Sequence, residues 1–85
     1  MCRSILELRG LEPPATADEI YAAARQYVRK VSGIREPKGN AVEPFHAAID
    51  EIAAITTSLL EAMPARRQPP ARVPPNRLVA GRSAL

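Results

Sequence analysis

Residues Thr16 to Glu19 form a helix-start signal that constrains the fold more than any other part of this 85-residue sequence. The Thr16 hydroxyl can accept a hydrogen bond from the N–H of Glu19, and the Glu19 carboxylate can accept one from the N–H of Thr16. Pro13 and Pro14 lie just before this pair and disfavour a helix that would run through it from upstream. We therefore expect a helix that begins at Ala17.

The apolar pattern after Ala17 predicts how far this helix extends and which face it buries. Apolar residues recur in steps of four, three and four, which is typical of one face of an amphipathic helix. The residues that define this stripe are Ile20, Ala24, Tyr27 and Val31, and Ala23 and Val28 widen it. Gly33 suits the left-handed conformation that closes a helix, and Arg29 and Lys30 are favourable in the last turn. We expect the helix to end near Ser32.

A second long helix is predicted after a polar, turn-forming stretch over residues 33 to 40. Two starts are open: Asn40 and Glu43 could form another capping box, or Pro44 could lie in the first turn. A heptad seam follows and ends before Pro64. The seam consists of Phe45, Ile49, Ile52, Thr56, Leu59 and Met63. It is wide enough to leave apolar surface near Leu59, Leu60 and Met63 after packing.

The residues before the first long helix predict a third, shorter one. Ile5 and Leu8 lie on one side of residues 3 to 9, and Gly10 can end a helix of about two turns. The fold class expected is all-α, with this short N-terminal helix packing across an antiparallel helical hairpin.

The composition changes after Met63. Residues 1 to 63 carry seven basic and nine acidic residues, a net charge of −2, whereas residues 64 to 85 carry five arginines and no acid. Five of the nine prolines also lie in this second part. We expect a small helical domain over residues 1 to 63 and a disordered Pro/Arg-rich tail over residues 64 to 85. The tail arginines are candidates for weak, salt-sensitive binding to nucleic acid, namely Arg66, Arg67, Arg72 and Arg77.

Cysteine usage and hydropathy predict a cytoplasmic protein. A single cysteine cannot form an internal disulfide, and no apolar run has the length of a signal peptide or membrane span. Removal of Met1 would leave Cys2 as a terminal residue with a free amine, beside Arg3, which favours the thiolate. Cys2 is therefore a candidate reactive thiol, and a small residue of the short helix is the alternative.

Several segments resemble a family of short, uncharacterised bacterial proteins whose N-terminus usually reads Met-Cys-Arg-Asn-Ile. The segments that carry the resemblance are Met1 to Arg3 with Ile5, Glu12 to Thr16, Ala22 to Lys30, Ser32 with Gly33, and Phe45 to Ala54. Ser4 stands where the family has asparagine. This resemblance covers about residues 1 to 63 and implies an independently folding unit, with no activity attached.

A second set of residues resembles the J-domain of chaperone cofactors. The matching positions include Pro13, Ala15, Thr16, Glu19, Ile20, Ala23, Arg25 and Lys30. The resemblance implies a three-helix arrangement. The family's His-Pro-Asp, needed to stimulate the partner chaperone's ATPase, is replaced by Ser32, Gly33 and Ile34, so this activity is not expected here. The basic outer face of the first long helix retains part of the docking surface that such domains use.

The residue types that support catalysis are few. His46 and Cys2 are too few for a structural zinc site, and the adjacent Asp50 and Glu51 point about 100° apart on a helix. No glycine-rich phosphate loop is present, and we expect no metal or cofactor. We therefore expect an adaptor-type protein-interaction module that contacts another protein or a second copy, and no membrane. The candidate contact residues are Arg25, Arg29, Lys30, Leu59, Leu60 and Met63. A nucleic-acid accessory role for the tail and a redox or metal-linked role for Cys2 remain the alternatives.

Overall fold

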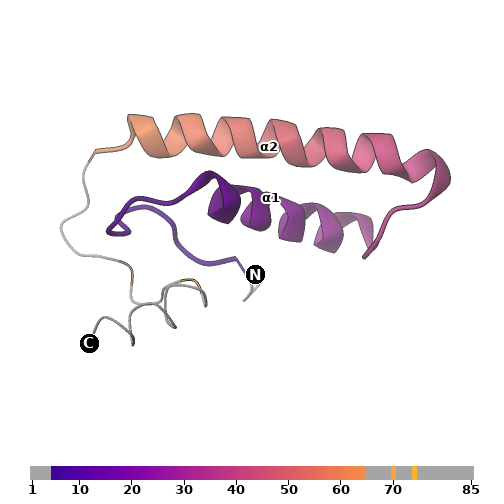
Figure 1. Ribbon diagram of the computed structural model, residues 1–85, viewed down its shortest axis with the longest axis horizontal. Helices are drawn as coiled ribbons and strands as arrows, with labels where there is room; N and C mark the ends of the chain where they lie inside the picture. Colours follow the sequence, from indigo (N-terminus) through magenta and orange to yellow (C-terminus); the bar gives the residue numbers. More distant parts are fainter. Residues whose placement is uncertain (1–4, 65–69, 71–73, 75–85) are drawn as a thin grey trace.

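The computed structural model describes residues 5 to 64 together with Pro70 and Pro74. It contains two α-helices, α1 (Ala17–Ser32) and α2 (Val42–Ala62), and a short 3₁₀ helix over Gly39–Ala41. The two α-helices lie side by side and run antiparallel, and no strand forms among the described residues (Figure 1). The chain is all-α over this part, as the sequence predicts.

The predicted start of α1 is confirmed in detail. The N–H of Glu19 donates to Thr16 Oγ1 over 3.1 Å, and the N–H of Thr16 donates to Glu19 Oε1 over 2.8 Å. The helix ends as expected at Gly33, which has a φ of 71° and donates its N–H to the Arg29 carbonyl over 3.0 Å. Side-chain caps and a left-handed residue therefore set both boundaries of α1.

The start of α2 distinguishes between the two predicted possibilities. Ala41 occupies the capping position and makes no side-chain hydrogen bond, so the capping box of Asn40 with Glu43 does not form. The 3₁₀ helix leads directly into Val42, and Pro44 lies in the first turn of α2. That position suits proline because the first-turn N–H groups have no helical partner. The helix ends at Ala62, just before Met63 and Pro64, as predicted.

The short helix predicted over residues 3 to 9 is wrong where the structure describes it. Residues 5 to 8 are not helical, and residues 9 and 10 form a turn in which Gly10 has a φ of 88°. A segment of this length gains too few hydrogen bonds to offset the cost of helix nucleation. The three-helix arrangement implied by the J-domain resemblance is therefore not formed by the described residues.

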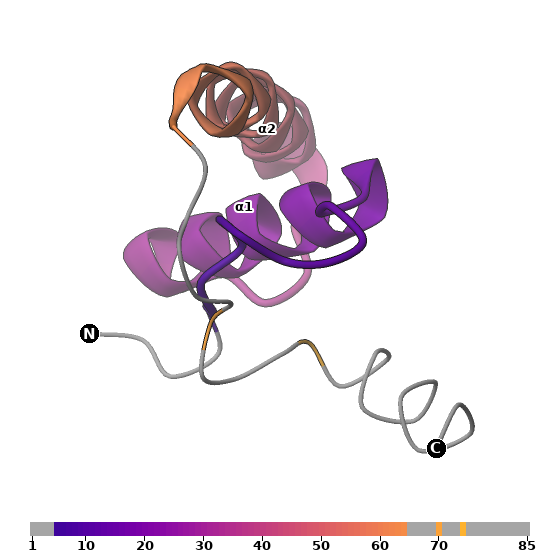
Figure 2. The same ribbon diagram turned by 90° about the vertical axis from the view of Figure 1, so that its left-hand side faces the viewer.

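The residues before α1 instead form a non-helical segment whose first part lies beside α1, on the side away from α2 (Figures 1 and 2). This N-terminal segment, residues 5 to 16, carries Leu11, which is one of the buried hydrophobic residues. The segment thus contributes to the core through Leu11 without being helical.

The main core is formed where α1 and α2 face each other. Ala24 and Val28 of α1 pack with Phe45 and Ile49 of α2, and Ile49 is fully buried. The partly buried residues around them are Ile34, Ala48, Ile52 and Ala53. Six hydrophobic residues are buried in the described part of the chain, so the core is thin.

The buried stripe of α1 differs from the predicted one. Ile20, Ala24 and Val28 are buried, whereas Tyr27 is 50% exposed and Val31 is also exposed. The two helices cross obliquely (Figure 2), and such crossings bring together rows of residues that are four apart. The alternating steps of four and three in the sequence describe nearly parallel helices, so they place Tyr27 at the centre of the stripe and Val28 only at its edge.

Candidate interaction surfaces

Three exposed apolar residues form a row at the C-terminal end of α2. Ile55, Leu59 and Met63 are spaced four apart and are 71%, 55% and 39% exposed. They lie on the flank of α2, next to the face that packs on α1. Leu60, which the sequence analysis places in this surface, is only half-buried and lies on the inner side of the helix. We call Ile55, Leu59 and Met63 the apolar row.

Ile55 is the member of the row that the sequence analysis missed. It lies outside the heptad seam, and the seam was the signal used to select apolar positions. Ile55 is found by counting back from Met63 through Leu59 in steps of four residues. Residues with this spacing lie on one flank of a helix.

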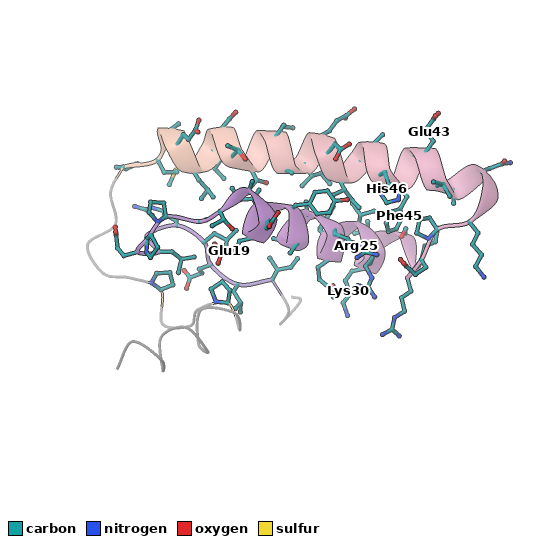
Figure 3. All side chains as sticks on the ribbon, viewed as in Figure 1. Glu19, Arg25, Lys30, Glu43, Phe45 and His46 are labelled. Carbon is teal, nitrogen blue, oxygen red and sulfur yellow. The ribbon has the colours of Figure 1, made fainter. Side chains whose placement is uncertain are left out.

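All charged residues on the solvent-facing part of α2 are acidic. Glu43, Asp50, Glu51 and Glu61 are all exposed, and α2 contains no lysine or arginine. Glu51 lies one turn before Ile55, on the same flank of α2 as the apolar row. The exposed His46 is placed near the other end of α2, where its ring meets the Phe45 ring edge-on at 5.6 Å (Figure 3).

The predicted basic face of α1 is partly neutralised. Arg25 Nη2 lies 2.7 Å from Glu36 Oε1, an ion pair between α1 and the segment that connects it to α2. Arg29 is half-buried and Lys30 is exposed, so the cation most open to a partner is Lys30. Surface ion pairs of this kind contribute about 0–1 kcal/mol, and their main effect here is to occupy Arg25.

The two candidate surfaces lie at opposite ends of the hairpin. Arg25 and Lys30 are near the loop end, together with Glu43 and His46 of α2 (Figure 3), whereas the apolar row is at the far end of α2. The structure therefore does not bring the six predicted contact residues into one site. Five of them lie on two separate surfaces, and Leu60 lies on the inner side of α2.

The far end of α2 is joined to the N-terminal segment by Arg9. Its Nε and Nη2 atoms both donate to the carbonyl oxygen of Pro64, each over 3.3 Å. Residues that are 55 apart in the sequence are thus held together directly after the apolar row. The guanidinium also places positive charge at the C-terminal end of α2, where the helix dipole favours it.

Neither a metal-binding group of side chains nor a membrane-spanning helix is found among the described residues. Within them, no group of three or more His, Cys, Asp and Glu side chains is arranged to hold a metal ion. None of their helices is both long enough and apolar enough to span a lipid bilayer. The predicted thiol and nucleic-acid sites, Cys2, Arg66, Arg67, Arg72 and Arg77, lie outside the described residues and stay predictions.

Comparison with known proteins places the chain among relatives without assigning an activity. A family model described as an uncharacterised conserved protein (DUF2277) matches residues 1–78. The match includes fifteen residues beyond Met63, so it extends into the Pro/Arg-rich part of the sequence. No curated protein and no solved structure matches the chain.

Proposed function

The chain belongs to the DUF2277 family of uncharacterised conserved proteins, and from this premise we propose that it is a non-catalytic protein-interaction module that binds through the apolar row of α2. The observation that carries the proposal is the exposure of Ile55, Leu59 and Met63 on consecutive turns of one helix flank.

The three residues of the apolar row differ from ordinary surface hydrophobic residues because they follow one another along one side of a helix. Single exposed apolar side chains are common on soluble proteins, but rows along a helix flank form a surface that a partner can cover. Burying apolar area is favourable by roughly 25 cal/mol per Å², and full burial of one Leu or Ile side chain by about 1.5–3 kcal/mol. Three such side chains supply enough free energy to contribute substantially to binding a partner.

The adaptor character of the proposal depends on the second surface. Lys30, with the half-buried Arg29, lies at the loop end of the hairpin, away from the apolar row. A partner that covers the row would leave this basic end of α1 open. Two partners of different chemistry could therefore bind the same molecule without overlapping.

Photocrosslinking in cells tests the proposal directly. p-Benzoylphenylalanine placed at position 55 should give a discrete crosslinked product, because this position lies within the proposed contact surface. The matched control places the same group at Val31, which is also highly exposed but lies near the loop end of α1. Leu59→Asp in the chain labelled at position 55 should abolish the product, since a charge in the row opposes apolar contact.

The proposal would be wrong if positions 55 and 31 gave the same products, or if Leu59→Asp left the product unchanged. The circular dichroism spectrum of Leu59→Asp serves as the folding control, and it should match the wild type because Leu59 is 55% exposed.

A further inference from the structure

We propose that the N-terminal segment carries a docking site for a basic, proline-containing chain, and that the occupant is this protein's own residues 65 to 78. The site is separate from the apolar row and does not depend on it. In place of the disordered tail expected from composition, these residues fold back on the helical domain.

Pro70 is a buried residue within the Pro/Arg-rich part of the sequence. Proline is mostly exposed in proteins, and Pro74, four residues later, is half-buried. Sequence neighbours alone leave much of a proline ring in water. The burial of Pro70 therefore requires contact with a more distant part of the chain.

The position of Pro64 limits which part this is. Arg9 holds the Pro64 carbonyl through two hydrogen bonds of 3.3 Å, so the chain leaves α2 beside the N-terminal segment. The six residues from Pro64 to Pro70 span at most about 20 Å. The 21 residues of α2 put the loop end of the hairpin about 31 Å away. Pro70 can therefore reach the N-terminal segment, the start of α1 and the end of α2, but not the loop end.

Within this reach, the N-terminal segment is the surface that fits best. The apolar row on α2 stays exposed, with Leu59 at 55% and Met63 at 39%, which is inconsistent with a segment packed across it. The first part of the N-terminal segment lies beside α1, on the side away from α2 (Figures 1 and 2). It offers half-buried apolar side chains to a proline ring, namely Ile5, Leu6 and Leu8.

The charges of the two segments are opposite. Residues 65 to 78 carry four arginines and no acid. Residues 5 to 20 carry four acids and one arginine, a net charge of −3, and Glu7, Glu12 and Asp18 are exposed. Opposite unit charges 4 Å apart attract by about 1 kcal/mol at the dielectric constant of water, and by more beside a protein surface. Electrostatic attraction thus adds to the apolar contact of Pro70.

The family match also includes the docking segment. It covers residues 1–78, so it extends through Pro70 and Pro74 and ends before Arg82. The pattern that defines the family therefore includes the residues that we assign to the docked segment, together with the helices.

Paramagnetic relaxation in the full chain tests the docking. Cys2→Ser removes the native thiol, and Ala17→Cys then carries a nitroxide spin label at the exposed start of α1. The label should broaden the amide NMR signals of residues 71 to 73 several-fold more than those of residues 83 to 85. The matched control places the label at Lys38→Cys, on the exposed loop, about 24 Å farther along α1. This control should broaden residues 71 to 73 much less.

Matched variants test the contacts that hold the segment. Pro70→Ser should reduce the broadening from position 17 several-fold, and Pro74→Ser should reduce it less because Pro74 is only half-buried. Glu12→Arg should also reduce it, whereas Asp50→Arg, at an exposed acid of α2, should not. The circular dichroism spectra of all four variants should match the wild type, since none of the substitutions is in the core between the helices.

Three results would overturn the proposal. The first is equal broadening of residues 71 to 73 from positions 17 and 38, or broadening no greater than that of residues 83 to 85. The second is broadening that Pro70→Ser leaves unchanged. The third is broadening that passes from a spin-labelled chain to a separate, isotope-labelled chain without a label, which would make a second copy the occupant.

Discussion

At the scale of single residues, three residues determine where α1 begins and ends. Thr16 and Glu19 satisfy each other's backbone N–H groups at its start, and Gly33 provides the left-handed closing residue. Both features are local, because each depends on residues within four positions of each other. Substitutions at these positions should therefore change the stability of the hairpin without changing its architecture.

Thr16→Ala should lower the free energy of unfolding by about 1 kcal/mol, since the N–H of Glu19 loses its side-chain acceptor. Urea denaturation followed by circular dichroism measures this change. Ser58→Ala is the control: it removes a hydroxyl from an exposed position of α2 and should change the stability by less than about 0.5 kcal/mol. Equal effects of the two substitutions would contradict the role given to the capping box.

Gly33→Ala should destabilise the protein by about 1 kcal/mol. A Cβ at Gly33 meets no atom within 4 Å, so steric contact contributes nothing and the cost comes from the φ of 71°. Left-handed geometry costs alanine about 1–2 kcal/mol, and the loss of unfolded-state entropy offsets part of it. Gly33→Asn should cost less because asparagine tolerates this region. Thermal unfolding of both variants checks the order, and a more stable Gly33→Ala would refute it.

These residue-scale features were predictable from the sequence because they depend on near neighbours. Thr16, Glu19 and Gly33 needed no knowledge of the tertiary structure. Asn40 shows the limit of such reasoning: it has a plausible capping partner in Glu43, but the 3₁₀ helix over Gly39–Ala41 moves the start of α2 past it. The alternative with Pro44 in the first turn proved correct.

At the scale of helices, α2 has two flanks with different environments. Ile49 is fully buried against α1, whereas Ile55 on the same helix is 71% exposed. The helix therefore provides both the centre of the core and the apolar row. This difference depends on how α1 crosses α2, and a heptad pattern does not contain that information.

A pair of identical substitutions measures the difference between the two flanks. Ile49→Ala should destabilise the hairpin by about 2–5 kcal/mol, because it leaves a cavity in a thin core. Ile55→Ala should change the stability by less than about 0.5 kcal/mol. Helix propensity and residue type are matched, so chemical denaturation of the two variants reports burial alone. Comparable losses would place Ile55 in the core and contradict its exposure.

The crossing of the helices also explains which part of the core was predictable. The sequence analysis identified Ile20, Ala24, Phe45 and Ile49 as inward-facing, and all four are buried. The predicted stripe also included Tyr27 and Val31, which are exposed, since a crossing angle cannot be read from spacing. Ile55, the most exposed member of the apolar row, was not predicted for the same reason.

At the scale of the whole molecule, the N-terminal segment joins the far end of the hairpin. The helix predicted over residues 3 to 9 would have used Ile5 and Leu8 as an amphipathic face. The described segment is not helical, and it contributes the buried Leu11 and the contact of Arg9 with Pro64. This contact joins residues that are 55 positions apart in the sequence, so no local sequence pattern predicts it.

Arg9→Met should loosen the end of α2 while leaving the core between the helices intact. The substitution keeps an apolar stem of similar length but removes both hydrogen bonds to the Pro64 carbonyl, which should cost about 1 kcal/mol. Hydrogen exchange measured by mass spectrometry should show faster exchange in the last turn of α2 and unchanged exchange around Ile49. Faster exchange throughout α2 would show that Arg9 supports the whole hairpin, and no change anywhere would show that the contact contributes nothing.

The unequal lengths of the two helices have a consequence for engineering. With 21 residues against 16, α2 extends past α1 at both ends, and Ile55 on its flank is 71% exposed. The arrangement is that of a helical bundle that lacks one helix. A chimaera that supplied this helix through a short linker should melt at a higher temperature than the natural chain. It should also no longer bind a partner through that flank.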